Sequence, residues 1–324
     1  MKRQTAEAIA RTAAMLRRAD DNGIGERFHL QWSRDYWRKK MDALLSILAI
    51  YGDLAERASG RVVVDYGGGL GILTIMLKET GFAGEVVYND IKPEVRDDAE
   101  LLWAEVGVAP DWISLGDTPE MVEGLRGLPV EAVVSYDVLE HIYVLPDHYK
   151  ALSSLEQAAV NLRVIHASGA NAYNRRYVRW VAPIHKEHEK RYLKRRCEII
   201  HDANPEIHAS GLTALGKLTR GMTRSGIEKA ARLGRGAFSM RHPTNTCDPD
   251  TGEWAENLMT HDYIKDAVER GGFDSVKIEP GTFGQYHGTP LRRLAKRALN
   301  TFIRRSPWGG MSLAPYFIVT AERD

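Results

Sequence analysis

Apolar residues along this chain alternate between two patterns, short continuous runs and helical spacings. The short runs, rich in valine and isoleucine, predict buried strands at residues 62–65, 85–89, 130–135 and 161–168. Helical spacing between these runs predicts helices over residues 72–78, 95–105 and 149–160. Strands that alternate with helices indicate an α/β fold with a parallel sheet, in which a ligand binds at the carboxyl ends of the strands.

The two ends of the chain add further elements to this core. Residues 5–18 and 32–50 carry apolar residues at helical spacing, so we expect a helical segment at the N-terminus. Thr260 is in a position to cap a helix that follows it. The C-terminal pattern predicts a helix, a sixth strand and a last strand, at 262–270, 275–279 and 315–321.

Charge divides the chain into blocks of opposite sign. Residues 61–171 carry a net charge of −11, whereas residues 172–242 carry +10. The basic block lies in a connection that is much longer than is usual between neighbouring elements of an α/β domain. We therefore expect four parts. A helical segment covers 1–60, the first part of the core covers 61–171, a basic and mostly helical insert covers 172–256, and the rest of the core covers 257–324.

Composition narrows the class of protein. With 324 residues, 44% of them hydrophobic, the chain is long enough for one substantial core and an added subdomain. No apolar run approaches the roughly 18 residues of a membrane helix, and charges interrupt the N-terminus too early for a signal peptide. Two isolated cysteines provide neither a disulfide framework nor a metal spacing. We expect a soluble, cytoplasmic protein.

A glycine-rich turn follows the first strand. Gly67, Gly69 and Gly71 allow the backbone to approach a ligand, and Asp90 ends the second strand, where a carboxylate can accept both hydroxyls of a ribose. A dinucleotide fold requires a third glycine under the pyrophosphate, but that position is occupied by Ile72 or Thr74, depending on which glycine starts the pattern. The turn therefore favours a nucleoside-type cofactor without a pyrophosphate.

Three later segments follow this turn in a particular order: Leu115-Gly116-Asp117-Thr118, Asp137-Val138-Leu139-Glu140-His141-Ile142 and Gly271-Gly272-Phe273. Together with the turn, they resemble the motifs of the class I S-adenosylmethionine (SAM) methyltransferases. The segment Asp137–Ile142 is most similar to small-molecule O-methyltransferases of the ubiquinone-biosynthesis and sugar-tailoring type. The resemblance covers roughly 61–171 and 257–324. It implies a doubly wound, seven-stranded, mainly parallel sheet of Rossmann-like type with SAM as cofactor.

The resemblance also implies a set of cofactor-binding residues, which are Asp65, Gly67, Gly69, Gly71, Asp90, Ile91, Asp117 and Tyr136. Asp65 is expected to order the turn through backbone N–H groups, Ile91 to pack on the adenine ring, and Asp117 to meet the adenine amino group. Ordinary turn chemistry is the alternative for each residue separately, although it does not explain their joint order.

Asp137 and His141 are the residues expected to face the methyl acceptor. A neutral histidine can take a proton from an acceptor hydroxyl, which makes His141 the candidate general base. The alternatives are that His141 packs on the next helix and that Asp137 caps it. Glu140 with these two residues could also hold Mg²⁺, as in some quinone O-methyltransferases, but no metal ligands are assigned.

The predicted activity is methylation of a hydroxyl oxygen on a small molecule or glycan. RNA methylation through the basic insert, a SAM-binding partner protein without turnover and a nicotinamide oxidoreductase remain alternatives, the first weakened by the absence of a nucleic-acid module. Residues 290–305 form a basic amphipathic helix that could contact a membrane surface, although a charge run is usually a solvated face. No feature of the sequence specifies an oligomeric state.

Overall fold

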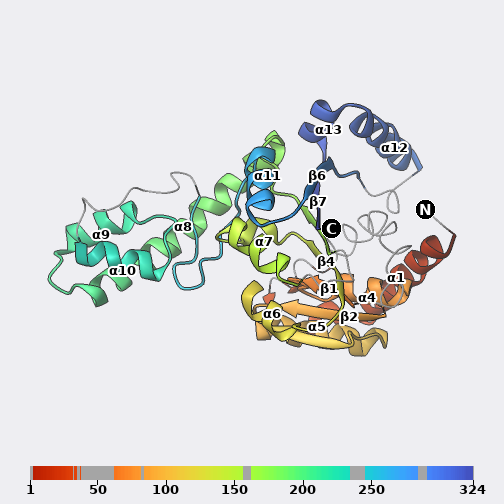
Figure 1. Cartoon of the computed structure of the whole chain (residues 1–324), viewed down its shortest axis with the longest axis horizontal. Coiled ribbons are helices and arrows are strands. Elements are labelled where there is room, and N and C mark those ends of the chain that lie inside the picture. The colour runs from red at the N-terminus through yellow and green to blue at the C-terminus, as the bar shows by residue number, and fades with distance from the viewer. Residues whose placement is uncertain are drawn as a thin grey trace. The chain divides into compact units, whose positions relative to one another are not determined.

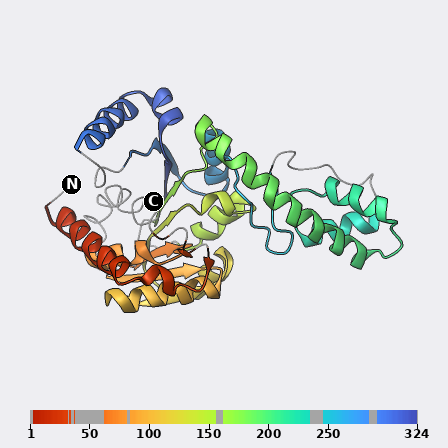
Figure 2. The ribbon, with the colours of Figure 1, turned by 180° about the vertical axis from the view of Figure 1, so that it is seen from behind.

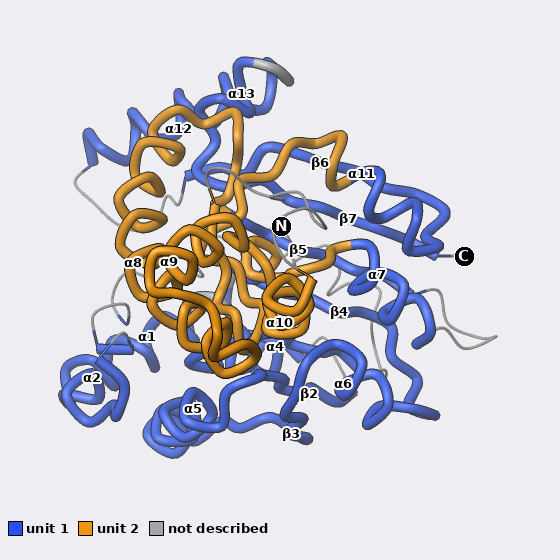
Figure 3. The backbone as a smooth tube through the Cα atoms, turned by 90° about the vertical axis from the view of Figure 1, so that its left-hand side faces the viewer, with its two compact units in different colours: residues 1–138, 146–168, 265–324 blue, residues 139–145, 169–264 orange. Residues whose placement is uncertain are grey.

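The computed structural model describes residues 3–31, 33, 34, 37, 62–81, 84–155, 162–233, 245–283 and 290–323. The chain divides into two compact units, coloured separately in Figure 3. Unit 1 contains Met1–Val138, Pro146–Ser168 and Lys265–Asp324, and unit 2 contains Leu139–Leu145 and Gly169–Ile264. Residues 139–145, which the sequence assigned to the core, therefore belong with the insert.

Unit 1 is built on one seven-stranded sheet with the order β3-β2-β1-β4-β5-β7-β6. Figure 1 labels β1, β2, β4, β6 and β7 of this sheet. The strands are β1 (Val62–Tyr66), β2 (Glu85–Asp90), β3 (Trp112–Leu115), β4 (Val130–Tyr136), β5 (Leu162–Ser168), β6 (Ser275–Pro280) and β7 (Phe317–Arg323). β7 is antiparallel to both of its neighbours, and the other pairs are parallel. The expected seven-stranded, mainly parallel sheet is confirmed.

The strand order reverses between β1 and β4. From β1 the chain continues outward to β2 and β3, and it then returns to pair β4 with the other side of β1. In a parallel sheet the connections on either side of such a reversal lead away from each other, which leaves a crevice at the carboxyl ends of the two strands. The glycine turn after β1 and the segment after β4 both lie at this end of the sheet.

The helices of unit 1 are α1 (Arg3–Asp21), α2 (Ile24–Arg27), α4 (Ile72–Thr80), α5 (Pro93–Val106), α6 (Thr118–Gly124), α7 (Leu145–Ser153), α12 (Pro290–Arg305) and α13 (Pro307–Leu313). α11 (His261–Arg270) begins in unit 2 and ends in unit 1. Figure 2 gives the reverse view of the same elements.

Successive side chains of a strand point to opposite faces of the sheet. Val63, Tyr88 and Ile165 share a hydrophobic core with residues of α1, α4 and α5. On the opposite face, His166 of β5 lies against His148 and Tyr149 of α7, with ring centroids 5.3 and 5.8 Å apart. The central strands are buried on both faces, which explains why they read as continuous apolar runs.

Several element boundaries differ from the sequence-based expectation. The helix predicted at 149–160 is α7, which begins at Leu145 because Pro146 is tolerated in a first helical turn, and which ends at Ser153. The last strand is shifted two residues toward the C-terminus, and the short helices α6 and α13 were not predicted. Most of the helix expected at 32–50 lies outside the described residues.

Unit 2 contains three helices from the basic segment, α8 (Arg175–Ala203), α9 (Ala209–Leu218) and α10 (Arg224–Leu233). They share a small apolar core to which Ile199, Leu215 and Ile227 contribute. Arg196 is fully buried beside this core, where it forms an ion pair with Glu189 (2.5 Å) and donates to the Gly216 carbonyl (2.8 Å). Because a buried guanidinium without partners would be strongly destabilising, these contacts fix how α8 meets α9.

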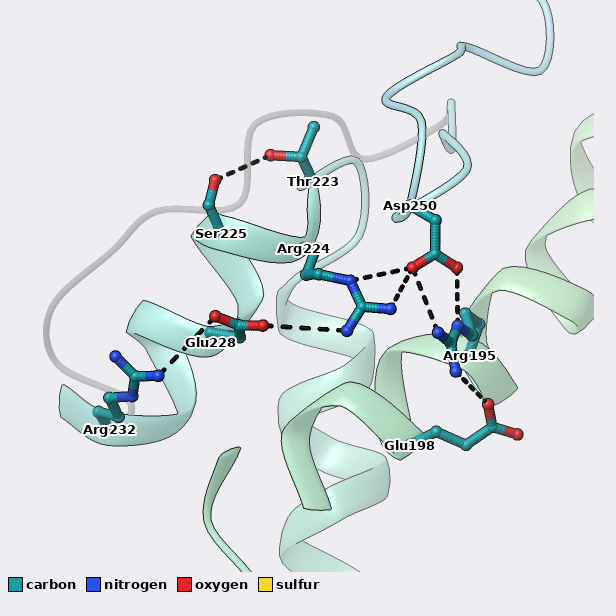
Figure 4. Close-up of polar contacts among 8 residues, drawn as sticks. All are labelled: Arg195, Glu198, Thr223, Arg224, Ser225, Glu228, Arg232 and Asp250. Carbon is teal, nitrogen blue, oxygen red and sulfur yellow. Dashed lines mark hydrogen bonds and ion pairs between the residues drawn. The ribbon is translucent and has the colours of Figure 1, made fainter. Parts of the chain in front are cut away.

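The loop after α10 is tied to two helices through one carboxylate. Asp250 accepts hydrogen bonds from Arg195 of α8 and from Arg224 at the start of α10 (Figure 4). Glu198 and Glu228 pair with the same two arginines from their own helices.

No helix in the described parts of the chain is long and apolar enough to cross a membrane.

Candidate functional site

The turn between β1 and α4 has a backbone that favours glycine. Gly67, Gly69 and Gly71 have φ angles of 63°, 55° and 66°, all in the left-handed region. Residues with a Cβ adopt this region at a cost, which explains why the sequence has glycine at alternate positions. The turn leads directly into Ile72, the first residue of α4.

The surroundings of the three glycines differ. A Cβ on Gly67 would lie 2.6 Å from Val138, and one on Gly71 would lie 2.3 Å from the indole nitrogen of Trp103. A Cβ on Gly69 would meet no atom of the described residues within 4 Å. Gly67 and Gly71 are therefore needed for packing, whereas Gly69 borders open space where a ligand can approach the backbone.

The Asp90 carboxylate joins the turn to the end of β2. Its Oδ2 accepts a hydrogen bond from the Gly69 N–H and its Oδ1 accepts one from the Lys92 N–H, both at 3.0 Å. A carboxylate offers about four acceptor positions, and these donors occupy one on each oxygen. These two hydrogen bonds hold Asp90 in a fixed orientation beside the turn.

The backbone donors of the turn are directed to the protein itself. The N–H of Gly68 donates to the Asn89 carbonyl (2.8 Å), that of Gly69 to Asp90, and that of Gly71 to the Gly68 carbonyl (2.9 Å). A turn that binds a pyrophosphate instead directs its N–H groups at the anion. Three N–H groups of this turn are thus already engaged by the protein, which disfavours a pyrophosphate.

Asp65 is a second carboxylate beside the turn, and it is buried. Its Oδ2 accepts a hydrogen bond from Thr74 Oγ1 (2.7 Å) in the first turn of α4. Burial raises the pKa of the Asp65 carboxyl from 3.8 to about 7; hydrogen bonds from Thr74 lower it, and the charge of Asp90 raises it further. The hydrogen bond from Thr74 to Asp65 holds the start of α4 in place behind the turn.

Asp117 and Ile91 lie at the ends of β3 and β2. Asp117 is the N-cap of α6 and forms a capping box with Glu120, in which Asp117 Oδ1 accepts from the Glu120 N–H (3.2 Å). This is the turn chemistry that the sequence left open for Asp117, and its contact with adenine stays a prediction. The Ile91 side chain is 51% exposed, and its packing on adenine also stays a prediction.

β4 ends in a strained corner. Asp137 is the one residue other than glycine with a positive φ (53°) in the described parts of the chain, and its N–H donates to the Ala167 carbonyl (2.9 Å). Strain of this kind persists where the surroundings hold it, and it concentrates at functional sites. The corner brings Val138 against Gly67. The half-buried Tyr136 ring packs edge-on against Tyr316, with centroids 6.5 Å apart.

His141 ends a short 3₁₀ helix (Leu139–His141) in unit 2. Its Nδ1 lies 2.8 Å from the Trp254 carbonyl oxygen. A carbonyl only accepts, so Nδ1 carries the proton and, in neutral imidazole, Nε2 carries the lone pair. The backbone thus fixes the tautomer in which Nε2 is the basic atom.

Carboxylates surround this histidine. One ligating atom from each of Glu140, His141 and Glu256 lies within 4.8 Å of the other two. Glu256 is oriented by the Tyr177 hydroxyl, which donates to its Oε2 (2.8 Å). Two carboxylates and an imidazole suit a divalent cation, so Glu140, His141 and Glu256 would hold such an ion. Glu256 stands here in place of the Asp137 that the sequence suggested with Glu140 and His141.

Sequence patterns missed several residues of these sites. Thr74, Trp103 and Val138 support the glycine turn through contacts in space, and Glu256 is far from His141 along the chain. Thr74 alone had a local signal, because it occupies the first turn of the helix that follows the glycines. The others read as ordinary apolar or charged positions.

No family model matches the chain, and no curated protein matches it. Solved structures with a similar arrangement include a SAM-dependent methyltransferase from Archaeoglobus fulgidus, with 15% identity over 88% of this chain and 94% of that one and a TM-score of 0.44. A second, from Mesorhizobium loti, has 12% identity, covers 86% and 98%, and gives a TM-score of 0.44. The cyclase SpnF has 12% identity, covers 89% and 82%, and gives 0.42. These identities are too low to transfer a reaction or a substrate.

Proposed function

We propose that this protein is a SAM-dependent methyltransferase that methylates a hydroxyl oxygen of a small molecule or glycan. The observation that carries the proposal is the turn after β1, in which Gly69 borders open space and Asp90 holds the backbone beside it. It lies at the point where the strand order reverses, the usual place of a nucleotide-type ligand in an open α/β sheet.

The residues fit an adenosyl group better than a dinucleotide. Asp90 would accept the ribose hydroxyls, and the exposed Ile91 would cover one face of the adenine ring. The internal hydrogen bonds of the turn disfavour a pyrophosphate. When bound, SAM supplies a methyl group on a sulfonium sulfur, and its departure leaves a neutral thioether. Gly67, Gly71 and Tyr136 complete the proposed binding residues, with Asp117 toward the adenine.

On the acceptor side, the chain has to orient a hydroxyl and remove its proton. His141 is the proposed base, because the Trp254 carbonyl leaves its Nε2 as the proton acceptor. Asp137 is proposed to orient the acceptor from the strained corner after β4. A metal at Glu140, His141 and Glu256 would occupy the same Nε2, so the two roles of His141 exclude each other.

Binding of S-adenosylhomocysteine, measured by titration calorimetry, tests the cofactor half. We expect wild type to bind, and Asp90→Ala to lose at least tenfold in affinity, because two hydroxyls lose their acceptor. Asp97→Ala, which removes an exposed carboxylate from α5, is the matched control. An analogue without ribose hydroxyls should bind wild type and Asp90→Ala equally weakly. Absence of binding to wild type, or tight binding of NADH, would overturn the proposal.

Transfer of labelled methyl groups to fractionated small molecules tests the acceptor half. His141→Gln should lower the rate by about 10²–10⁴-fold while leaving affinity for S-adenosylhomocysteine unchanged. His201→Gln, an exposed histidine on α8, should behave as wild type. Loss of activity in EDTA, restored by Mg²⁺ and matched by Glu256→Gln, would assign His141 to a metal instead. Label found only in RNA would favour the nucleic-acid alternative.

A further inference from the structure

α12 has an inner face that is anchored to the rest of unit 1. The Asn300 side chain accepts from the Phe283 N–H and donates to the Phe283 carbonyl, both at 2.8 Å. Ile303 is fully buried, and a Cβ on Gly310 of α13 would lie 2.2 Å from the Ile303 carbonyl oxygen. These contacts fix the rotation of the helix about its axis and so define which side chains point away from the protein.

The outer face of α12 carries several large apolar side chains that are exposed, which is unusual for a helix surface in water. Leu291, Leu294 and Phe302 are 76%, 63% and 50% exposed. At 100° per residue they fall within about 80° of one another, with the exposed Ala298 between them. We call Leu291, Leu294, Ala298 and Phe302 the apolar stripe.

Basic residues border this stripe. α12 contains six Lys or Arg and no Asp or Glu. Arg297, Arg304 and Arg293, all exposed, lie about 60°, 80° and 100° beyond the Leu294 edge of the stripe, between it and the anchored Asn300. Within the described residues none of these three forms an ion pair with an acidic side chain. The helix thus presents apolar side chains beside a row of positive charges.

We propose that the outer face of α12 docks on anionic lipid headgroups, with the apolar stripe inserted between the lipids and the helix axis parallel to the bilayer surface. The charge pattern selects this occupant. A second copy of the same helix would bring two rows of arginine together, and a nucleic acid would give the exposed leucines and Phe302 nothing to contact. A bilayer of anionic lipid satisfies both the apolar stripe and the basic border.

Vesicle co-sedimentation of the full-length protein tests this surface. Wild type should bind vesicles of phosphatidylcholine and phosphatidylglycerol, should bind pure phosphatidylcholine at least tenfold more weakly, and should be released by salt. Replacing the apolar stripe in the double variant L291S/L294S should weaken binding at least tenfold. The charge variant R293Q/R297Q should weaken binding and reduce its dependence on salt.

Two exposed side chains on other helices supply the controls. Leu233→Ser on α10 removes a leucine that is 58% exposed, and Lys217→Gln on α9 removes an exposed charge. Both should bind vesicles as wild type does, and all variants should keep the wild-type circular dichroism. Failure of wild type to bind the anionic vesicles, or unchanged binding by L291S/L294S, would overturn the proposal. So would binding of RNA that depends on Arg293 and Arg297 but not on the leucines.

Discussion

At the scale of single residues, glycines of the same backbone conformation have different roles. Gly69 and Gly71 both have positive φ, yet Gly71 faces the Trp103 indole and Gly69 faces open space. Replacing either with alanine costs backbone energy, but only at position 71 does the new methyl group also collide with a packed ring. Gly71 is therefore required by the packing of the fold, whereas Gly69 leaves room for a ligand.

We expect Gly71→Ala to lower the free energy of unfolding by about 3 kcal/mol, from backbone strain plus overpacking against Trp103. Gly69→Ala should lower it by about 1 kcal/mol, from the backbone alone. In binding, Gly69→Ala should still weaken S-adenosylhomocysteine, because its methyl group occupies the ligand's side of the turn. Urea unfolding and calorimetry measure the two effects. Equal losses of stability would contradict the contact with Trp103.

At the scale of elements, a buried chain of polar side chains joins β1, α6, α7, β5 and β4. The sequence of hydrogen bonds runs from Tyr66 through Thr118, His148 and His166 to Ser135, with donor–acceptor distances of 2.7, 2.8, 3.3 and 2.6 Å. Each inner group can donate one bond and accept one, so both histidines are satisfied in the neutral form.

Burial lowers the pKa of His166 to about 3, and burial together with the neighbouring His166 lowers the pKa of His148 well below 6.5. A group with a depressed folded-state pKa binds protons mainly in the unfolded state once the pH falls below about 6.5. Each histidine therefore contributes stability at pH 7 that is lost on acidification; for His166 the loss is about 2 kcal/mol by pH 5.

Hydrogen exchange of β4 and β5 peptides at pH 7 and pH 5 tests this, after correction for intrinsic exchange rates. The loss of protection on acidification should be smaller in His148→Gln than in wild type, whereas His201→Gln should match wild type. Asp65 has the opposite effect on the free energy of unfolding. Because its pKa is raised in the folded state, stability is lost as the pH rises from 3.8 to about 7. Asp65 is present in wild type and in both variants, so its effect cancels in the comparison. Identical pH dependence in His148→Gln would sink this account.

The Asp250 contacts in unit 2 operate at the same scale but are exposed. Arg195 and Asp250 side chains are each 38% exposed, so the pair is screened by water and salt. We expect Asp250→Asn to cost less than about 1 kcal/mol overall, while hydrogen exchange of residues 248–254 accelerates clearly. Asp202→Asn, an exposed carboxylate at the end of α8, should change neither. A large global loss would mean that these contacts support the unit's core.

At the scale of the whole molecule, two units share one chain, and the proposed cofactor residues all belong to unit 1. Ligand binding stabilises only the states that bind, by about 2.7 kcal/mol at a ligand concentration a hundredfold above the dissociation constant. Stabilisation by the cofactor product should therefore be uneven along the chain.

We expect S-adenosylhomocysteine to slow hydrogen exchange at residues 62–81, 85–91 and 112–118, and to leave α9 and α10 unchanged. Exchange followed by mass spectrometry measures both regions in one sample, and Asp90→Ala at the same ligand concentration is the control. Protection confined to unit 2, or spread evenly over both units, would contradict the assignment of the cofactor to the crevice of the sheet.

What the sequence determined by itself is local. Runs of apolar residues placed the central strands, because a strand buried on both faces has no polar alternation. The glycine spacing identified the turn, because left-handed φ angles exclude most other residues. Asp90 was also predicted from local sequence, because it ends a strand that follows the glycine turn closely along the chain. The amphipathic helix at 290–305 was also predicted from its period.

Only the tertiary structure decided which distant residues meet. It brought Glu256 beside His141, paired His148 with His166, and gave Thr74 to Asp65, and it fixed β7 as antiparallel. It also decided which face of α12 is covered. Contacts between residues far apart along the chain leave no periodicity or turn signal, because they depend on how whole elements pack and not on the conformation of any one of them.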